Sequence, residues 1–181
     1  MRIISGTYKG KSFQAPKAIK ARPTTDFAKE ALFSILENKI DIPACTVLDL
    51  FSGTGSISYE FASRGAIATT SVDANIASYR FINSNAIDWN MPIKAIKSET
   101  FKFLKKVDQT FDIIFADPPY ALKKINQLPD AIFESEAAKK AKIIIIEHGQ
   151  ETDYSKHERH LETRVYSRVN FSFFKAFEQE A

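Results

Sequence analysis

Short apolar stretches alternate with stretches of helical pattern along most of this 181-residue sequence, and the alternation restricts the fold more than any other feature. Apolar strands are expected at residues 47–51, 67–72, 93–97, 111–116 and 143–147. Helices are expected from the start signals at 22–26, from Ser56 to Arg64, from the capping residue Asn75 towards Trp89, and through Ile132 to Ala138. Strands and helices that alternate at this spacing favour an α/β fold, a mostly parallel sheet with helices on both faces.

The two ends of the chain depart from this alternation. Near the N-terminus, two apolar segments flank Gly6 to Gly10, a pattern that predicts a short hairpin or extended arm. Near the C-terminus, apolar residues occupy odd positions from Val165 to Phe177, and no helix fits between Leu161 and Phe177. Two antiparallel strands are therefore expected to complete the sheet.

Length and composition fit one globular domain. The chain is 44% hydrophobic and 26% charged, and neither a repeat nor a second-domain boundary is visible. We therefore expect one domain over residues 1–181, with a basic arm at 1–22 and the core at 23–181. The single cysteine, Cys45, excludes an intrachain disulfide, and the three histidines (His148, His157 and His160) lack metal-ligand spacing, so no metal site is expected. The chain has no signal-peptide or membrane-spanning pattern, which favours a cytoplasmic, soluble monomer.

Basic residues are concentrated at the N-terminus, although the net charge is only +3. Six of them precede the first acidic residue, Asp26: Arg2, Lys9, Lys11, Lys17, Lys20 and Arg22. Together with Tyr8 and Phe13, such an arm could neutralise nucleic-acid phosphates. A solvated segment without a partner is an equally good interpretation of charge alone.

A glycine-containing turn follows the first expected strand. Gly53 and Gly55 let the backbone approach a ligand, and the helix that follows presents free N–H groups. The turn lies at the carboxyl edge of the expected sheet, where ligands bind in α/β folds. A dinucleotide fingerprint would need glycine at the position of Ser58, and the lysine of a phosphate-binding P-loop is absent. With Asp49 ahead of the turn, a ligand that carries an ammonium group fits better than a pyrophosphate.

Two further acidic residues follow strands. Asp73 comes after the second expected strand, where a carboxylate can chelate a ribose diol. Glu99 comes after the third, where it could reach an adenine amino group, with Thr100 supplying a backbone contact. A carboxylate at a helix N-terminus explains Glu99 equally well.

The most specific motif is Asp117-Pro118-Pro119-Tyr120, directly after the fourth expected strand. The consecutive prolines stiffen the turn, remove two donors and leave the Pro118 carbonyl free to accept. Asp117 adds a second acceptor, and Tyr120 offers a face on which a base can stack. Two acceptors and an aromatic ring suit an exocyclic amine of a nucleobase, because acceptors on its N–H bonds stabilise the positive charge that develops when it acts as a nucleophile.

With these motifs, nearly the whole sequence resembles the bacterial 16S ribosomal RNA guanine-N2 methyltransferases of the RsmD type. Six segments carry the resemblance: Arg2-Ile-Ile-Ser-Gly-Thr-Tyr-Lys-Gly-Lys, Arg22-Pro-Thr-Thr-Asp, Glu30-Ala-Leu-Phe, Leu48-Asp-Leu-Phe-Ser-Gly-Thr-Gly-Ser, Ser63-Arg-Gly-Ala and Asp117-Pro-Pro-Tyr. The chain departs from the family at Ser5 and at Ser167, where glycine is usual, so local differences are expected in the hairpin and in the last turn.

The resemblance implies a Rossmann-like class I methyltransferase fold, with a seven-stranded sheet, an antiparallel C-terminal strand pair and the small N-terminal hairpin arm. It implies S-adenosylmethionine as methyl donor and 16S ribosomal RNA, free or in an assembling small subunit, as substrate. The candidate donor-binding residues are Asp49, Ser52, Gly53, Thr54, Gly55, Asp73, Glu99 and Thr100. The candidate catalytic residues are Asp117, Pro118, Pro119 and Tyr120, and the candidate RNA-binding residues are Arg2, Lys9, Lys11, Lys17 and Arg22.

Three other functions share parts of this pattern. An adenine-N6 DNA methyltransferase uses the same kind of tetrapeptide, but it normally needs a further domain to read DNA. A glutamine-modifying protein methyltransferase carries asparagine where this chain has Asp117. A non-catalytic RNA-binding protein on the same scaffold would be expected to have lost one of the two loops.

Overall fold

The computed structural model describes residues 1–19 and 25–176, and its centre is a seven-stranded sheet in the order β3-β2-β1-β4-β5-β7-β6. The first five strands along the chain pair in parallel, β7 pairs antiparallel with β5, and β6 pairs antiparallel with β7. The strands are β1 (Thr46–Leu50), β2 (Ala68–Asp73), β3 (Ile93–Lys97), β4 (Ile113–Ala116), β5 (Ile143–His148), β6 (His160–Tyr166) and β7 (Val169–Lys175). The predicted fold class is confirmed, including the antiparallel pair at the C-terminal end.

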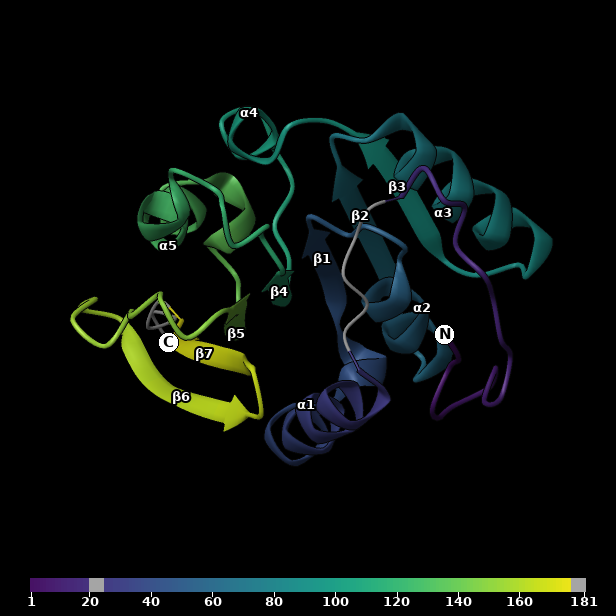
Figure 1. The fold of residues 1–181 in the computed structure, drawn as a ribbon, viewed down its shortest axis with the longest axis horizontal. Helices are drawn as coiled ribbons and strands as arrows, with labels where there is room; N and C mark the ends of the chain where they lie inside the picture. Colours follow the sequence, from purple (N-terminus) through teal and green to yellow (C-terminus); the bar gives the residue numbers. More distant parts are fainter. Residues whose placement is uncertain (20–24, 177–181) are drawn as a thin grey trace.

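Helices cover both faces of the sheet (Figure 1). On one face lie α1 (Asp26–Lys39), α2 (Ser56–Ser63) and α3 (Ile76–Asp88), and on the other lie α4 (Thr100–Leu104) and α5 (Leu128–Phe133). Short 3-10 turns occupy Ile42–Ala44, Ile125–Gln127 and Glu136–Ala138. Side chains cap two of the long helices: Thr25 accepts from the Ala28 N–H and the predicted cap Asn75 from the Ala77 N–H. Among the described residues, no helix has the length and apolar character needed to cross a membrane.

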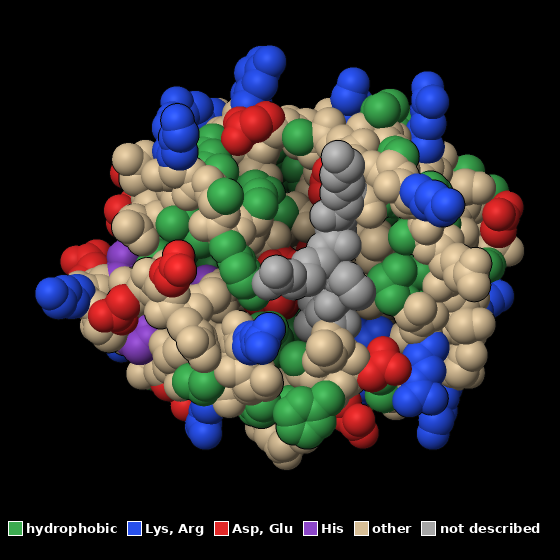
Figure 2. Space-filling model, in the orientation of Figure 1, with side chains coloured by type: hydrophobic (Ala, Val, Ile, Leu, Met, Phe, Trp, Pro, Cys, Tyr) green, Lys and Arg blue, Asp and Glu red, His purple; other side chains and the backbone are tan. Residues whose placement is uncertain are grey.

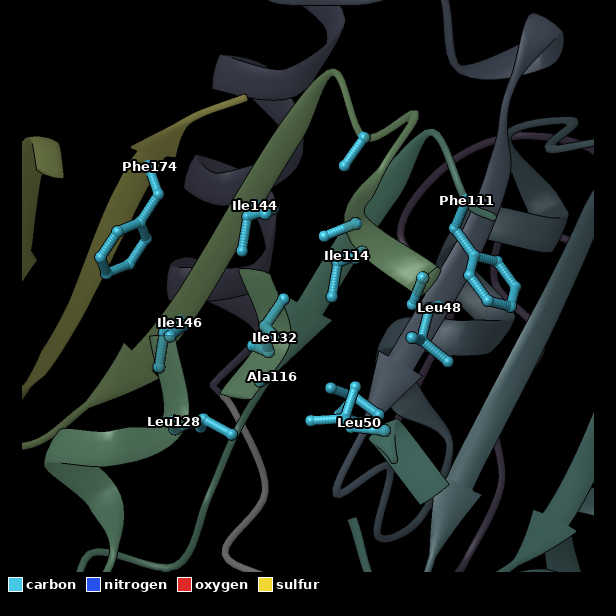
Figure 3. Close-up of a cluster of buried hydrophobic side chains, with 14 of the residues drawn as sticks. Leu48, Leu50, Phe111, Ile114, Ala116, Leu128, Ile132, Ile144, Ile146 and Phe174 are labelled. Atoms are coloured by element: carbon cyan, nitrogen blue, oxygen red, sulfur yellow. The ribbon is translucent and has the colours of Figure 1, made fainter. Parts of the chain in front are cut away.

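Central strands are buried on both sides, which explains why they form continuous apolar runs in the sequence. Towards α4 and α5, Leu48 and Leu50 of β1 pack with Ile114 and Ile144 and with α5 residues (Figure 3). On the opposite face, towards α1 and α2, Val47 of β1 packs with the alternate residues of β4 and β5, whose side chains point to this face, and with two phenylalanines of β7. The two clusters fix the sheet in place beneath its carboxyl edge.

The N-terminal segment forms the predicted hairpin and packs against the domain. Arg2 and Ser12 form an antiparallel bridge, and the Ile3 N–H donates to the Lys11 carbonyl at 2.9 Å. Ile3 and Phe13 are buried, and the Phe13 ring meets the Tyr59 ring of α2 edge to face. The hairpin is therefore part of the core on the α2 and α3 side, so the description of the arm as a solvated segment is wrong for its backbone and apolar side chains.

Several predicted element bounds differ from the structure. The strand expected at 47–51 ends at Leu50 because Phe51 has a positive φ of 58°, which a strand does not accommodate. The strand expected at 111–116 begins at Ile113. The helix expected through 132–138 is broken after α5, because Ser135 is extended and the next turn is 3-10. Helix α4 was expected only through one interpretation of Glu99, as a carboxylate at a helix N-terminus, and its bounds were not predicted.

The turn between β6 and β7 contains the second departure from the family pattern. Ser167 has φ of 60°, a left-handed conformation that glycine adopts without steric cost. The preference for glycine at this position follows from that geometry, and here serine occupies it.

Candidate functional site

Two loops are joined at the carboxyl edge of the central strands. Leu50 at the end of β1 pairs with Val72 of β2 and with Ala116 of β4. Beyond the strand ends, the Ser52 N–H donates to the Val72 carbonyl at 3.1 Å and the Asp117 N–H donates to the Leu50 carbonyl at 3.2 Å. The glycine turn and the Asp117–Tyr120 loop are thereby fixed to the same strand, as parallel pairing predicts.

The glycine turn has backbone conformations that require its glycines. Gly53 has φ of 52° and Gly55 has φ of 78°. A Cβ on Gly55 would lie 2.8 Å from Cγ1 of Ile82 and 3.0 Å from Cζ of Tyr59, so a larger residue would clash as well as strain the backbone. Helix α2 begins at the next residue, so its first N–H groups face the turn. Thr54 in the turn is buried, and its hydroxyl donates to the Met1 sulfur at 3.4 Å.

Two polar groups at this edge are suited to a ligand. The Ser52 hydroxyl oxygen is buried and makes no hydrogen bond with the described residues. Asp73, at the end of β2, accepts from the Gly53 N–H at 2.8 Å and from the Asn75 N–H at 2.7 Å. The bond from Gly53 holds the Asp73 carboxylate against the glycine turn, while ribose binding by Asp73 stays a prediction.

Asp49 occupies a different environment from the one its sequence position suggested. It is 1% exposed, lies on the α2 face of β1, and accepts from the Ser58 hydroxyl at 2.5 Å. Ser58 also lies 2.6 Å from the Ser71 hydroxyl, and burial raises the pKa of Asp49 to about 7. The predicted contact of Asp49 with an ammonium group therefore stays a prediction, with its carboxyl beneath the turn. The sequence analysis noted Ser58 only because it stands where a dinucleotide fingerprint has glycine, and did not identify it as the hydrogen-bond partner of Asp49.

Replacing Asp49 by asparagine tests this environment. Between about pH 4 and pH 7 the folded state holds a proton that the unfolded chain has released, so the stability contributed by protonated Asp49 is full below pH 4 and is lost as the pH rises through 7. Asp49→Asn removes this pH dependence but adds an amide N–H that needs an acceptor at every pH, so we expect the variant to be less stable than the parent at pH 4 and the difference to shrink or reverse as the pH rises to 8. Urea unfolding of both proteins across this range measures the difference, and a constant difference would contradict the buried, protonated carboxyl.

Glu99 and Thr100 lie at the start of α4. The Glu99 carboxylate accepts from the Phe101 N–H at 3.1 Å and from the Lys102 N–H at 2.8 Å, so it is the N-cap of this helix. Thr100 is buried as its first residue. The helix-capping interpretation of Glu99 is thus confirmed, while a contact of either residue with a ligand stays a prediction.

The tetrapeptide forms the loop directly after β4. Pro118 is buried, Pro119 is exposed and Tyr120 is 39% exposed. The Tyr120 ring lies against the backbone of Gly149, where a Cβ would be 3.1 Å from Cδ2 of the ring. The ring of the buried His148 forms two hydrogen bonds. Nδ1 lies 2.9 Å from the Gly149 carbonyl oxygen, and Nε2 lies 2.8 Å from the Ser172 hydroxyl. The Tyr120 ring thus lies against the residue that follows β5, a support that the sequence did not reveal.

The predicted RNA-binding residues of the arm are not equally available. The Arg2 guanidinium pairs with Asp26 at 2.9 Å, and the Lys11 ammonium lies 4.8 Å from the centre of the Trp89 ring. Lys9 and Lys17 are exposed and form no ion pair with another described residue. Arg22 lies outside the described residues.

Solved structures share this architecture. A structure titled as the putative methyltransferase yhhF from Escherichia coli superposes with a TM-score of 0.82 at 24% identity, covering 97% of each chain. The seven-stranded order with its antiparallel β7, the glycine turn after β1 and the proline loop after β4 place the chain in the Rossmann-like class I methyltransferase fold.

Sequence comparison identifies the family. The family model described as Conserved hypothetical protein 95 matches residues 1–175, and the chain belongs to this family, the RsmD family. One relative is the Ribosomal RNA small subunit methyltransferase D of Buchnera aphidicola subsp. Baizongia pistaciae, 32% identical over 149 residues, or 81% of this chain and 75% of the relative. Another is the Putative rRNA methyltransferase YlbH of Bacillus subtilis, 31% identical over 158 residues, or 84% and 85% of the two chains.

Proposed function

We propose that this chain, a methyltransferase by its family and fold, transfers a methyl group from S-adenosylmethionine to the exocyclic N2 amine of a guanine in 16S ribosomal RNA. One observation carries the proposal: the Asp117–Tyr120 loop and the glycine turn are fixed side by side at the carboxyl end of β1. The names of the relatives above support ribosomal RNA as the substrate.

The residues at this edge fit S-adenosylmethionine. Gly53 and Gly55 supply the positive φ angles that shape the turn, and the buried Ser52 hydroxyl needs a partner that a polar ligand would supply. Asp73 would hold the ribose hydroxyls, because its carboxylate already lies against the turn. When bound, the donor supplies an electrophilic methyl carbon next to a sulfonium charge. The residues of the chain have to orient it and exclude water.

The tetrapeptide would activate the amine that accepts the methyl. The lone pair of an exocyclic amine is delocalised into the base, so the amine is a weak nucleophile. The Asp117 carboxylate and the Pro118 carbonyl would accept hydrogen bonds from the two N–H groups of the amine. They would thereby stabilise the positive charge that grows on the nitrogen as it bonds to the methyl carbon. Tyr120, seated on Gly149, would stack on the base and fix its plane, which adds the advantage of proximity and orientation.

Methylation of defined RNA tests the proposal. Small-subunit ribosomal RNA transcribed in vitro carries no methyl groups, so incubation with the protein and labelled S-adenosylmethionine should yield N2-methylguanosine at one position by mass spectrometry. Large-subunit RNA is the control and should stay unlabelled. Assembled small subunits, tested in parallel, distinguish free RNA from protein-bound RNA as substrate. Label on adenine N6 of DNA, label on glutamine, or no transfer to RNA would refute the proposed function.

A further inference from the structure

A groove runs along the β3 edge of the sheet, on the side of α4. Its volume is about 580 Å³, and β2, β3, α4 and the segment after α4 line it. Four of the lining residues are lysines: Lys94, Lys97, Lys102 and Lys106. All four side chains are exposed, and apolar side chains such as Phe103 and Phe111 form the floor.

The lysines of this groove have no acidic partners. None of the four forms an ion pair with another described residue, whereas Arg2 of the N-terminal arm is paired with Asp26. The two acidic residues that line the groove are Glu99, whose carboxylate caps α4, and Asp108. Four lysines against two acids leave a positive surface, and one of those acids is already engaged by backbone N–H groups. A chain with a net charge of only +3 thus concentrates unpaired positive charge here.

The basic surface continues towards the candidate active site. Lys124 follows the tetrapeptide by four residues, and its ammonium lies 5.8 Å from the centre of the Phe101 ring in α4. The next residue of α4, Lys102, lines the groove. Figure 2 shows Lys and Arg side chains projecting along the upper edge of the molecule, where Figure 1 places α4 and the end of β3. A polyanion bound at the tetrapeptide can therefore extend over α4 and remain in contact with positively charged side chains along its path.

We propose that the groove between β3 and α4 binds the phosphate backbone of the RNA strand that continues from the target nucleotide. This inference rests on the proposed function, because it takes the occupant to be the RNA substrate. Lysines at the rim bind phosphates as point charges, and such contacts position an RNA without reading its sequence. The half-buried Phe103 side chain at the floor offers an apolar surface to sugars and bases that face inward.

The test compares two double variants that each remove two positive charges. Lys102→Ala/Lys106→Ala alters the groove, whereas Lys139→Ala/Lys140→Ala alters two exposed lysines before the amino end of β5, four strands away from β3 in the sheet; Lys139 pairs with Glu136. Binding of a fluorescent single-stranded RNA oligonucleotide is measured by anisotropy over a series of salt concentrations. Each lost phosphate contact lowers the slope of log affinity against log salt by about 0.7, so the groove variant should lose about 1.4 and the control variant nothing.

Each result has a definite meaning. If the groove variant keeps the slope of the parent, or if both doubles lose the same amount, the groove is not an RNA path and the proposal is overturned. The proposal is also overturned if the parent protein binds RNA with an affinity that does not depend on salt. Methyl transfer to small-subunit RNA is assayed in the same preparations. A groove-dependent slope without methyl transfer refutes the proposed function alone, whereas methyl transfer with an unchanged slope refutes the groove alone.

Discussion

Replacing Asp117 by alanine is expected to lower the rate of methyl transfer at saturating RNA by about a hundredfold or more, by analogy with the loss of one preorganised hydrogen-bonding group in an oxyanion hole. The acceptor acts mainly on charge that develops in the transition state, so kcat should fall much more than KM for RNA rises. The backbone N–H of Asp117 continues to donate to the Leu50 carbonyl in this variant, so the loop stays attached to β1. Single-turnover transfer from labelled donor measures the effect.

Substitutions of Tyr120 are the matched controls for this result. Tyr120→Phe keeps the ring on Gly149 and should be nearly silent. Tyr120→Ala removes a stacking contact worth about 1 to 3 kcal/mol per base, and the loss should appear mainly in RNA binding because stacking precedes methyl transfer. An Asp117→Ala protein that transfers methyl at the parent rate would show that the tetrapeptide is a structural turn only.

The order of the elements could be predicted from sequence because the central strands and the glycine turn have local signals. The apolar runs of β1, β4 and β5 are buried on both faces, and the turn glycines have the positive φ angles that their positions suggested. Helix α4 has only five residues and no strong periodic pattern, so the sequence indicated its start at Glu99 as one of two interpretations but not its extent. At Ser135 the backbone becomes extended and the side-chain hydroxyl donates to the Ile132 carbonyl at 2.6 Å, a local break that helical periodicity did not indicate.

The position of a candidate site residue could be predicted from the sequence only where that residue lies directly at the end of a strand. Asp73 and Asp117 lie where the strand ends place them. The contacts that surround other candidate residues come from parts of the chain that are distant in sequence. Ser58 of α2 donates a hydrogen bond to Asp49, and Gly149, after β5, lies against the ring of Tyr120. Parallel pairing brings strand ends together, but the face of each side chain decides its environment, and a shift of one residue reverses that face. Asp49 illustrates the point, because it shares the α2 face with Val47.

A buried ionic network joins the hairpin to α1 and α2, and no sequence motif indicated it. The side chains of Lys29 and Glu60 are 1% and 0% exposed, with Nζ 3.6 Å from Oε2. Lys29 also donates to the Arg2 carbonyl at 2.6 Å and to the Ser56 hydroxyl at 3.2 Å. Burial lowers the pKa of Lys29, and the nearby Glu60 carboxylate opposes that shift. The network therefore lies directly beneath the first residue of α2, next to the glycine turn.

Glu60 is the centre of this network. Its carboxylate accepts from the backbone N–H groups of Ile4 and Ser5 at 2.9 and 3.0 Å, and from Arg64 at 2.9 Å. A single carboxylate thus satisfies two hairpin donors and two cations. Desolvation of so many groups makes the intact network a weak source of stability, but removal of the Glu60 carboxylate leaves the buried Lys29 ammonium without its anionic partner.

Glu60→Ala is therefore expected to lower the free energy of unfolding by about 3 to 5 kcal/mol, whereas Glu136→Ala, which breaks an exposed pair with Lys139, should cost less than about 1 kcal/mol. Lys29→Met should cost less than Glu60→Ala, because the Glu60 carboxylate keeps Arg64 and the hairpin donors. Urea unfolding gives the three values. Limited proteolysis gives a second readout, since loss of the bonds to Ile4 and Ser5 should expose the hairpin to cleavage before the sheet unfolds. A Glu60→Ala protein as stable as the parent, with a protected hairpin, would show that water or rearranged side chains replace the carboxylate and that the network does not hold the hairpin in place.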